Sequence, residues 1–403
     1  MKLEKRTTLI VCAALGLLGW TAAVRAQGEP WNDIVARAKG QTAYFNAWAG
    51  DEKTNAFIAW AGDELKRRYD VSVQHVRLKD TAEAVQRVIA EKQAGRNQGG
   101  SVDLIWINGP NFLAMKEQKL LYGPFTQQLP NFALVDTARR SNLIDFTVPV
   151  EGLESPWRVA QIVFVYDSAR IKQVPRTIPA MLDWARKNAG RMTHPNVRNF
   201  LGATFLKQAL VELTADAALL QQPATDANFA AASGPMWSWY EQLRPLLWRG
   251  GAQFPENGPA QRQLLNDGEI DLLISFNPAE AAVSSLAGSM PESVRTFVLE
   301  RGTIGNTSFV AIPYNASHRE AAMVLANFLL EPATQARAQD VRTMGNFSVL
   351  DLKRLAPADR IRFDELTPHP ALPTNAELGT VLLEPHPSWM TRITAEWERR
   401  YSK

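Results

Sequence analysis

Short β-prone runs alternate with amphipathic helical segments along this chain, and this alternation restricts its fold more than any other feature. Residues 41–48, 71–76 and 101–108 are apolar runs of strand length with β-branched or aromatic side chains. Helical segments follow the first two runs, over 51–69 and 81–93, and the second of them carries its apolar residues on one face. The order strand, helix, strand, helix predicts a parallel α/β sheet.

A second α/β region begins near residue 150. Residues 146–156 are rich in proline and glycine, and the strongly β-prone run 159–166 follows them. We expect a further buried strand over 270–276 and amphipathic helices over 317–330 and 384–401. Because 403 residues exceed what one hydrophobic core usually supports, two domains are expected.

The first 26 residues have the three parts of a secretory signal. Lys2, Lys5 and Arg6 form a positive start, residues 9–20 form an apolar run, and small residues end the segment at Ala26. The apolar run is shorter than the ~20 residues that a membrane-spanning helix needs, although a membrane anchor is the alternative interpretation. The pattern predicts export to the periplasm with cleavage near Ala26.

The exported part of the chain has no cysteine and no net charge. Cys12 is the single cysteine and lies in the signal, so disulfides and thiolate-based metal sites are excluded from the exported part. The chain has 44 basic and 41 acidic residues, and without 1–26 it has 40 of each. Since no basic stripe interleaved with aromatic residues is present, nucleic-acid binding is not expected.

Three corners of the chain share one design, in which a predicted strand ends, a small or capping residue follows, and a helix begins. In an open α/β sheet such corners line the ligand crevice, and helix N-termini there offer free N–H groups. The alternative is structural, because Asn277, Pro278 and Glu280 also suit a capping box and Asp51 suits a helix N-terminus. The corners nominate these ligand-binding residues: Trp48, Asp51, Glu52, Trp106, Asn108, Asn277 and Glu280.

Two further segments nominate ligand-binding residues. The loop 193–199 contains Asn196 and leads into a helix in which Gly202 would let another molecule approach the backbone closely. Trp157 and Arg158 lie where the chain is expected to cross between domains, and they could stack on a ring or pair with an anion. The alternatives are helix capping by Asn196 or Asn199, and packing between domains by Trp157 and Arg158.

A search for enzyme chemistry finds no catalytic set. The five histidines show no spacing suited to a metal site, and neither a G-x-S-x-G elbow nor a phosphate-binding P-loop is present. Carboxylates are plentiful, but no pair stands out for acid–base work. We therefore expect no catalytic residue, no metal and no cofactor, and we expect the chain not to be an enzyme.

The order of several segments resembles that of bacterial extracellular solute-binding proteins of ABC transporters, and specifically the YnjB-type branch. The segments are 46–50, 102–109, 161–167, 190–196 and 271–277. The resemblance implies a two-lobed α/β fold of the type II periplasmic-binding-protein kind, with a central ligand cleft and crossing hinge strands.

The resemblance also implies a division of the chain and a set of partners. Residues 27–155 and 300–345 would form lobe 1, 156–299 would form lobe 2, and 346–403 would be a C-terminal helical segment packed on the lobes. The partners would be a small-molecule ligand and an inner-membrane ABC permease with its ATPase, and the chain would be a monomer.

The resemblance does not identify the ligand, since related branches bind thiamine, polyamines, ferric iron or anions. The tandem tyrosines typical of iron binders are absent, which counts against iron. Tryptophans near Asp51 and Glu280 favour a thiamine-like or cationic organic molecule. The alternatives are an anion-binding transport protein, a periplasmic hydrolase and a sensory binding module of the same fold.

Overall fold

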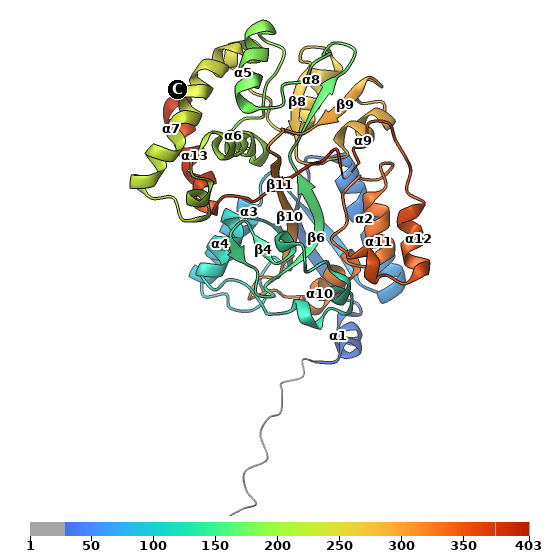
Figure 1. Cartoon of the computed structure of the whole chain (residues 1–403). Coiled ribbons are helices and arrows are strands. Elements are labelled where there is room, and N and C mark those ends of the chain that lie inside the picture. The colour runs from blue at the N-terminus through green and yellow to red at the C-terminus, as the bar shows by residue number, and fades with distance from the viewer. Residues whose placement is uncertain (1–28, 375, 403) are drawn as a thin grey trace, which may run out of the picture.

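The computed structural model describes residues 29–374 and 376–402, which form two α/β bodies joined by crossing segments (Figure 1). The signal predicted over 1–26 lies outside the described residues. We call the part built on the larger sheet the first body and the part built on the smaller sheet the second body. Among the described residues, no helix combines the length and the apolar character that crossing a membrane requires.

The first body is built on a mixed sheet in the order β11-β10-β3-β1-β2, with β6 paired to β10. Strands β1, β2 and β3 are parallel, as predicted, and β10 runs antiparallel to both β3 and β6. The strands are β1 (Thr42–Trp48), β2 (Ser72–Leu78), β3 (Leu104–Ile107), β6 (Glu154–Gln161), β10 (Thr303–Ala311) and β11 (Val381–Leu382).

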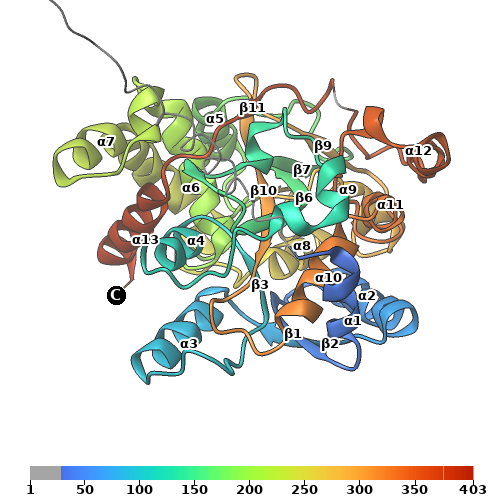
Figure 2. The ribbon, with the colours of Figure 1, turned by 90° about the horizontal axis from the view of Figure 1, so that it is seen from below.

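Helices cover both faces of the first sheet (Figure 2), because consecutive strand residues point to opposite faces. Leu104 and Trp106 pack on one side against α2 and α10, whereas Ile105 and Ile107 pack on the other side against α3 and α4. The helices of this body are α1 (Trp31–Ala38), α2 (Glu52–Tyr69), α3 (Ala82–Gln93), α4 (Pro110–Glu117), α10 (Arg319–Leu329), α11 (Pro332–Gln339) and α12 (Pro357–Asp364). A small hairpin, β4 (Ile144–Asp145) and β5 (Val148–Pro149), precedes β6.

The second body has a three-stranded sheet in the order β8-β7-β9, and both pairings are antiparallel. The strands of this sheet therefore do not continue the parallel arrangement predicted from the first three runs. The physical reason is that the chain enters this body along β7 (Val163–Asp167) and leaves it along β9 (Val294–Phe297), so these neighbours must run in opposite directions. The third strand is β8 (Leu272–Ser275).

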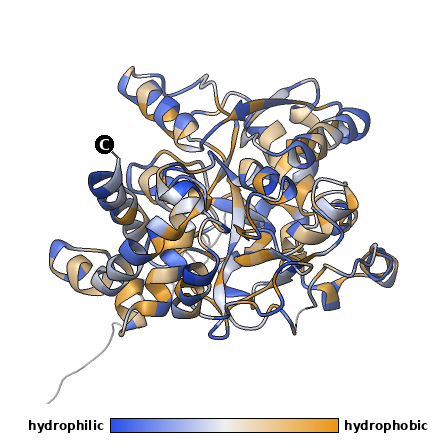
Figure 3. Cartoon of the chain, turned by 90° about the horizontal axis from the view of Figure 1, so that it is seen from above, coloured by the Kyte–Doolittle hydropathy of each residue, from blue (hydrophilic) through white to orange (hydrophobic). Residues whose placement is uncertain are grey.

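Helices also cover both faces of the second sheet. Phe164 and Ile274 pack with α5, α6 and α7, whereas Val165 and Leu273 pack with α8 and α9. The helices are α5 (Ile178–Lys187), α6 (Phe200–Leu213), α7 (Asp226–Leu243), α8 (Gly258–Asn266), α9 (Glu280–Leu286) and α13 (Pro387–Tyr401). Hydrophobic residues concentrate in the central strands, while the outer helices also carry hydrophilic residues (Figure 3).

The connections between the bodies run along β6 and β10. Strand β6 pairs with β10 over most of its length, and the chain reaches the second sheet only at Val163. The C-terminal region contacts both bodies, since Phe363 of α12 belongs to the first core and Trp389 of α13 belongs to the second.

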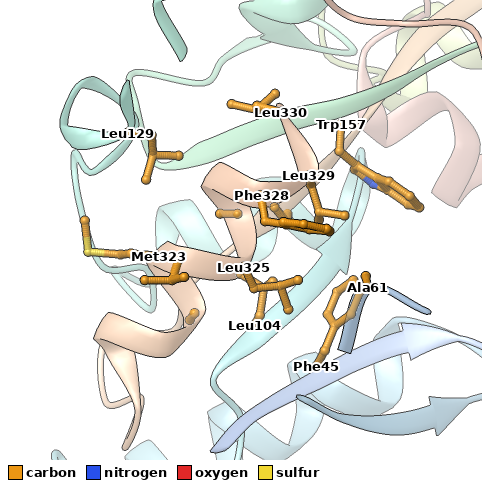
Figure 4. Packing of buried hydrophobic residues seen from close by; sticks show 14 of the residues in the cluster. Phe45, Ala61, Leu104, Leu129, Trp157, Met323, Leu325, Phe328, Leu329 and Leu330 are labelled. Atoms are coloured by element: carbon orange, nitrogen blue, oxygen red, sulfur yellow. The ribbon is translucent and has the colours of Figure 1, made fainter. Parts of the chain in front are cut away.

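The first core contains a residue that the sequence nominated for ligand binding. Trp157 of β6 is 1% exposed and lies with Phe45, Leu104 and Phe328 (Figure 4). Its indole stacks on Phe57 with ring centroids 6.4 Å apart. Trp157 is therefore a core aromatic of the first body, whereas the alternative expected for it was packing between domains.

Candidate ligand cleft between the two bodies

A cavity of about 290 Å³ lies between the two bodies and is lined by residues of both. The corners after β1 and β3 contribute from the first body, and the corner after β8 with the start of α6 contributes from the second. Cavities of roughly 300–1,000 Å³ hold small organic ligands in other proteins. Seven of the ten nominated residues line it: Trp48, Asp51, Trp106, Asn108, Arg158, Asn277 and Glu280.

Glu52, Asn196 and Trp157 lie outside the cavity lining. Glu52 is exposed in the first turn of α2, because the neighbouring Asp51 turns inward as the N-cap of that helix. Trp157 lies behind Trp106, with its ring edge-on at a centroid distance of 5.1 Å.

Asn196 is displaced from the cavity by the packing of its own loop on α6. A Cβ atom at Gly202 would lie only 2.2 Å from the carbonyl oxygen of Pro195 and 2.3 Å from that of Asn196. The sequence analysis expected another molecule to approach the backbone at Gly202, but the chain's own loop lies there instead. The side chain of Asn196 accepts a hydrogen bond from the N–H of Arg198, whereas Asn199 caps α6.

An ion cluster joins the two bodies across the cavity. Arg262 of α8 donates to Asp51 Oδ1 at 3.2 Å and to Glu280 Oε1 at 3.1 Å. Asp51 also caps α2 by accepting from the N–H of Thr54 at 2.9 Å, which confirms the structural role suggested for it. The carboxylates of Glu280 and Asp51 raise the pKa of Arg262, so this guanidinium stays charged.

Glu280 is held by its neighbours in a geometry that the capping-box alternative did not predict. Its carboxylate accepts from Ser275 Oγ at 3.0 Å and from Ser284 Oγ at 2.9 Å. Helix α9 begins at Glu280 itself, and Asn277 accepts from the N–H of Ala279 in a turn that precedes the helix. The capping-box interpretation of this corner is therefore wrong.

Aromatic rings form much of the apolar wall. Trp48 and Trp106 meet edge-on at a centroid distance of 6.4 Å, and Phe200 and Phe276 face the cavity from the second body. The indole of Trp48 folds over Gly50, where a Cβ atom would lie 2.3 Å from the ring. A side chain at position 50 would therefore force this indole to shift.

Arg158 of β6 lines the cavity with its guanidinium 4.2 Å above the indole of Trp106. Its Nε donates to Ser308 Oγ at 3.2 Å, and its Nη1 donates to Asn346 Oδ1 at 3.5 Å. Burial lowers the pKa of Arg158 to about 10, and the carboxylate of Asp51 partly offsets this effect. The side chain still carries its charge at neutral pH.

Sequence reasoning missed several lining residues. Arg262 belongs to a helix that was not predicted, although Asn257 and Pro259 are a start signal for it. Asn306 and Ser308 lie two residues apart in β10 and both line the cavity, since strand residues i and i+2 share a face. Polar residues with this spacing in an apolar strand were the available signal.

No metal site accompanies these groups in the part of the chain that the structure describes, since no cluster of three potential ligands is present there. Asn108 donates one amide hydrogen to the carbonyl of Thr307 at 2.6 Å, and Asn277 donates one to the carbonyl of Met344 at 2.9 Å. The arrangement offers charged, polar and aromatic contacts to a ligand.

A buried carboxyl group supports the corner after β3. Asp145 is 1% exposed, and its Oδ2 accepts from the N–H of Gly109 at 2.6 Å. Gly109 has a φ of 54°, and a Cβ atom there would lie 2.8 Å from the ring of Phe146. Burial raises the pKa of Asp145 to about 8.

This raised pKa predicts that Asp145 makes the protein less stable as the pH rises. Unfolded aspartate titrates near pH 4, so its stabilising contribution is complete below about pH 4 and is lost as the pH rises through 8. We expect the stability difference between Asp145→Asn and wild type to shift by about 3 kcal/mol in favour of the variant from pH 5 to pH 8. Urea unfolding of both proteins at the two pH values measures it. An unchanged difference would contradict the assignment.

The family model described as "Bacterial extracellular solute-binding protein" matches residues 60–350. Protein YnjB of Escherichia coli (strain K12) is 40% identical over 387 residues, which cover 96% of this chain and 97% of that protein.

Solved structures with a similar fold are periplasmic binding proteins of low sequence identity. The TpPotD lipoprotein of Treponema pallidum has a TM-score of 0.65 and 15% identity, covering 90% of this chain and 100% of its own. AfuA of Actinobacillus pleuropneumoniae, with fructose-6-phosphate bound, has a TM-score of 0.62 and 14% identity, covering 90% and 99%. Iron-bound HitA of Pseudomonas aeruginosa has a TM-score of 0.60 and 15% identity, covering 90% and 99%. These likenesses confirm the two-lobed α/β fold.

Proposed function

The chain belongs to the family of bacterial extracellular solute-binding proteins, and from this premise we propose that it captures one small solute in the cleft between its two bodies. Members of this family bind small ligands and work with ABC-transporter permeases, and they are transport proteins, not enzymes. The delivery partner proposed for this chain is an inner-membrane permease with its ATPase. The proposed location is the periplasm, after cleavage near Ala26, with the protein acting as a monomer.

The observation that carries this proposal is the Asp51–Arg262–Glu280 cluster across the cavity. Asp51 belongs to the first body, and Arg262 and Glu280 belong to the second, so the cluster forms only when the bodies approach each other. We propose that the two bodies are lobes that close about a hinge, and that the chain crosses between them along β6 and β10. A solute that contacts both lobes would stabilise the closed state by its preferential binding to that state.

The same cluster favours a thiamine-like or cationic organic solute as a finer proposal. Two carboxylates share one guanidinium, which leaves one formal negative charge beside the indole of Trp48. A cation or a positively charged ring at this position would gain from both the charge and the aromatic face. AfuA has fructose-6-phosphate bound and HitA has iron bound, although the two have similar folds, so the fold alone does not identify the solute.

A thermal-shift screen of the mature chain tests the proposed function. The solutes are thiamine, its phosphates, polyamines, amino acids, sugar phosphates and oxyanions. A solute at 100 times its dissociation constant should stabilise the protein by about 2.7 kcal/mol, which raises the melting temperature measurably. We expect Trp48→Ala to lose this shift, because its indole lines the cavity, and Trp248→Ala to keep it, because Trp248 hydrogen-bonds to Glu269 outside the cavity. Failure of every solute, or consumption of the best one, would refute the proposal.

A further inference from the structure

Arg158 lines the cleft and, unlike Arg262, has no acidic side chain in direct contact with it. Its contacts are the hydroxyl of Ser308, the amide oxygen of Asn346 and the indoles of Trp106 and Trp157, with guanidinium-to-ring distances of 4.2 and 5.2 Å. Within residues 29–374 and 376–402, no carboxylate lies within ion-pair distance of it. The groups in direct contact with this guanidinium are all neutral, so an anion that entered the cleft would form the ion pair that the chain does not supply.

The other cations that line the cleft have different surroundings. Arg262 is paired with Asp51 and Glu280, and Lys53 donates to the carbonyl of Arg342 at 3.2 Å. Lys79 is exposed at the rim, where water solvates its ammonium group. Among these cations, Arg158 combines an aromatic ring on one face with guanidinium hydrogens that no group of the described chain accepts.

The geometry of Arg158 leaves one edge of the guanidinium open. Ser308 Oγ accepts a hydrogen bond from Nε, and Asn346 Oδ1 accepts one from Nη1. No hydrogen bond from Nη2 is present among the described residues. The ring of Trp106 covers one face of the group and holds its plane. The remaining Nη1 and Nη2 hydrogens form the fork that binds two oxygens of a carboxylate or phosphate in parallel.

We propose that the solute of this protein carries an anionic group, a carboxylate or a phosphate, which binds the open edge of Arg158 inside the cleft. The proposal rests on the proposed function and deepens it. Arg158 would bind the anionic group, and the Asp51–Arg262–Glu280 cluster would face a cationic or polar remainder. The expected ligand class is a small organic zwitterion with an aromatic or apolar body.

The first test observes Arg158 directly. The full mature chain, labelled with ¹⁵N-arginine, is titrated with inorganic phosphate and with acetate at constant ionic strength. The Arg158 Nε–H resonance is assigned by its loss in Arg158→Lys, and the indole of Trp106 should separate it from the other arginines. We expect a saturable shift of this resonance with either anion. No movement with either anion up to about 100 mM would overturn the proposal.

The second test uses the best solute of the thermal-shift screen and two matched variants. Arg158→Gln should weaken its binding by about 30-fold or more, because it removes one half of a desolvated charge pair. Arg337→Gln is the control, since Arg337 lies 4.4 Å above the indole of Trp60 and does not line the cleft. It should change the affinity by less than about threefold. Ser308→Ala, which frees the Arg158 side chain without removing its charge, should weaken binding less than Arg158→Gln.

The outcomes separate this inference from the proposed function. If the solute binds Arg158→Gln as tightly as wild type, the binding function stands and the anionic group is refuted. If phosphate shifts Arg158 but no organic solute binds, the anion site stands and the proposed function fails.

Discussion

Replacing Lys207 by methionine is expected to lower the free energy of unfolding by about 3 to 5 kcal/mol. Lys207 of α6 is fully buried, and its Nζ donates to Glu384 Oε2 at 2.6 Å. The other oxygen of Glu384 accepts from the amide of Asn306 at 2.8 Å. Burial lowers the pKa of Lys207 and raises that of Glu384, yet the close contact supports an ion pair. Without Lys207, Glu384 would be a buried carboxyl group without its partner.

The double variant Lys207→Met with Glu384→Gln separates the loss of the pair from the loss of packing. Glutamine keeps an oxygen for Asn306 and removes the buried charge, so we expect it to recover more than half of the loss. Lys39→Met, on an exposed lysine, should change stability by less than about 0.5 kcal/mol. Urea unfolding measures all three. If the double variant is no more stable than the single one, the destabilisation does not come from an unpaired carboxyl group.

Replacing Trp157 by alanine is expected to lower the free energy of unfolding by about 3 to 5 kcal/mol. The side chain is 1% exposed and packs against Phe57 and Trp106 in the first core. Its indole N–H is buried and has no hydrogen-bond acceptor among the described residues. Phenylalanine would keep most of the ring and remove this unsatisfied N–H, so Trp157→Phe should cost less than about 1.5 kcal/mol.

Trp157 and Trp48 are expected to have different roles, the first in the core and the second in the cleft. Trp48 is partly exposed in the cleft, so Trp48→Ala should lose solute binding with a smaller loss of stability. Chemical unfolding and a solute titration of Trp157→Phe and Trp48→Ala distinguish the two roles. Normal stability together with lost binding in Trp157→Phe would show that Trp157 contacts the solute after all.

Much of the fold was predictable because it depends on local patterns. The runs that became β1, β2 and β3 are apolar and bounded by helix-start signals, and the corners after β1, β3 and β8 meet at the cleft as the topology of an open sheet requires. The direction of the strands in the second sheet was not predictable in this way, because it depends on where the chain enters and leaves that body.

The residues that sequence reasoning misplaced or missed depend on contacts between distant parts of the chain. Trp157 and Arg158 are neighbours with opposite environments, since alternate strand residues point to opposite sides, and composition could not say which one faces the core. Arg262 meets Asp51 across 211 positions of sequence. Asn196 lies outside the cleft because Gly202 lets its own loop pack closely.

Titration calorimetry of the mature chain with the best solute of the screen tests the central claim most directly, because it distinguishes binding from turnover. We predict a saturable heat with one solute per chain, which Trp48→Ala abolishes and Trp248→Ala retains. Heat that continues after saturation as the solute is consumed, or the same titration curve from Trp48→Ala as from wild type, would contradict capture of a solute in this cleft.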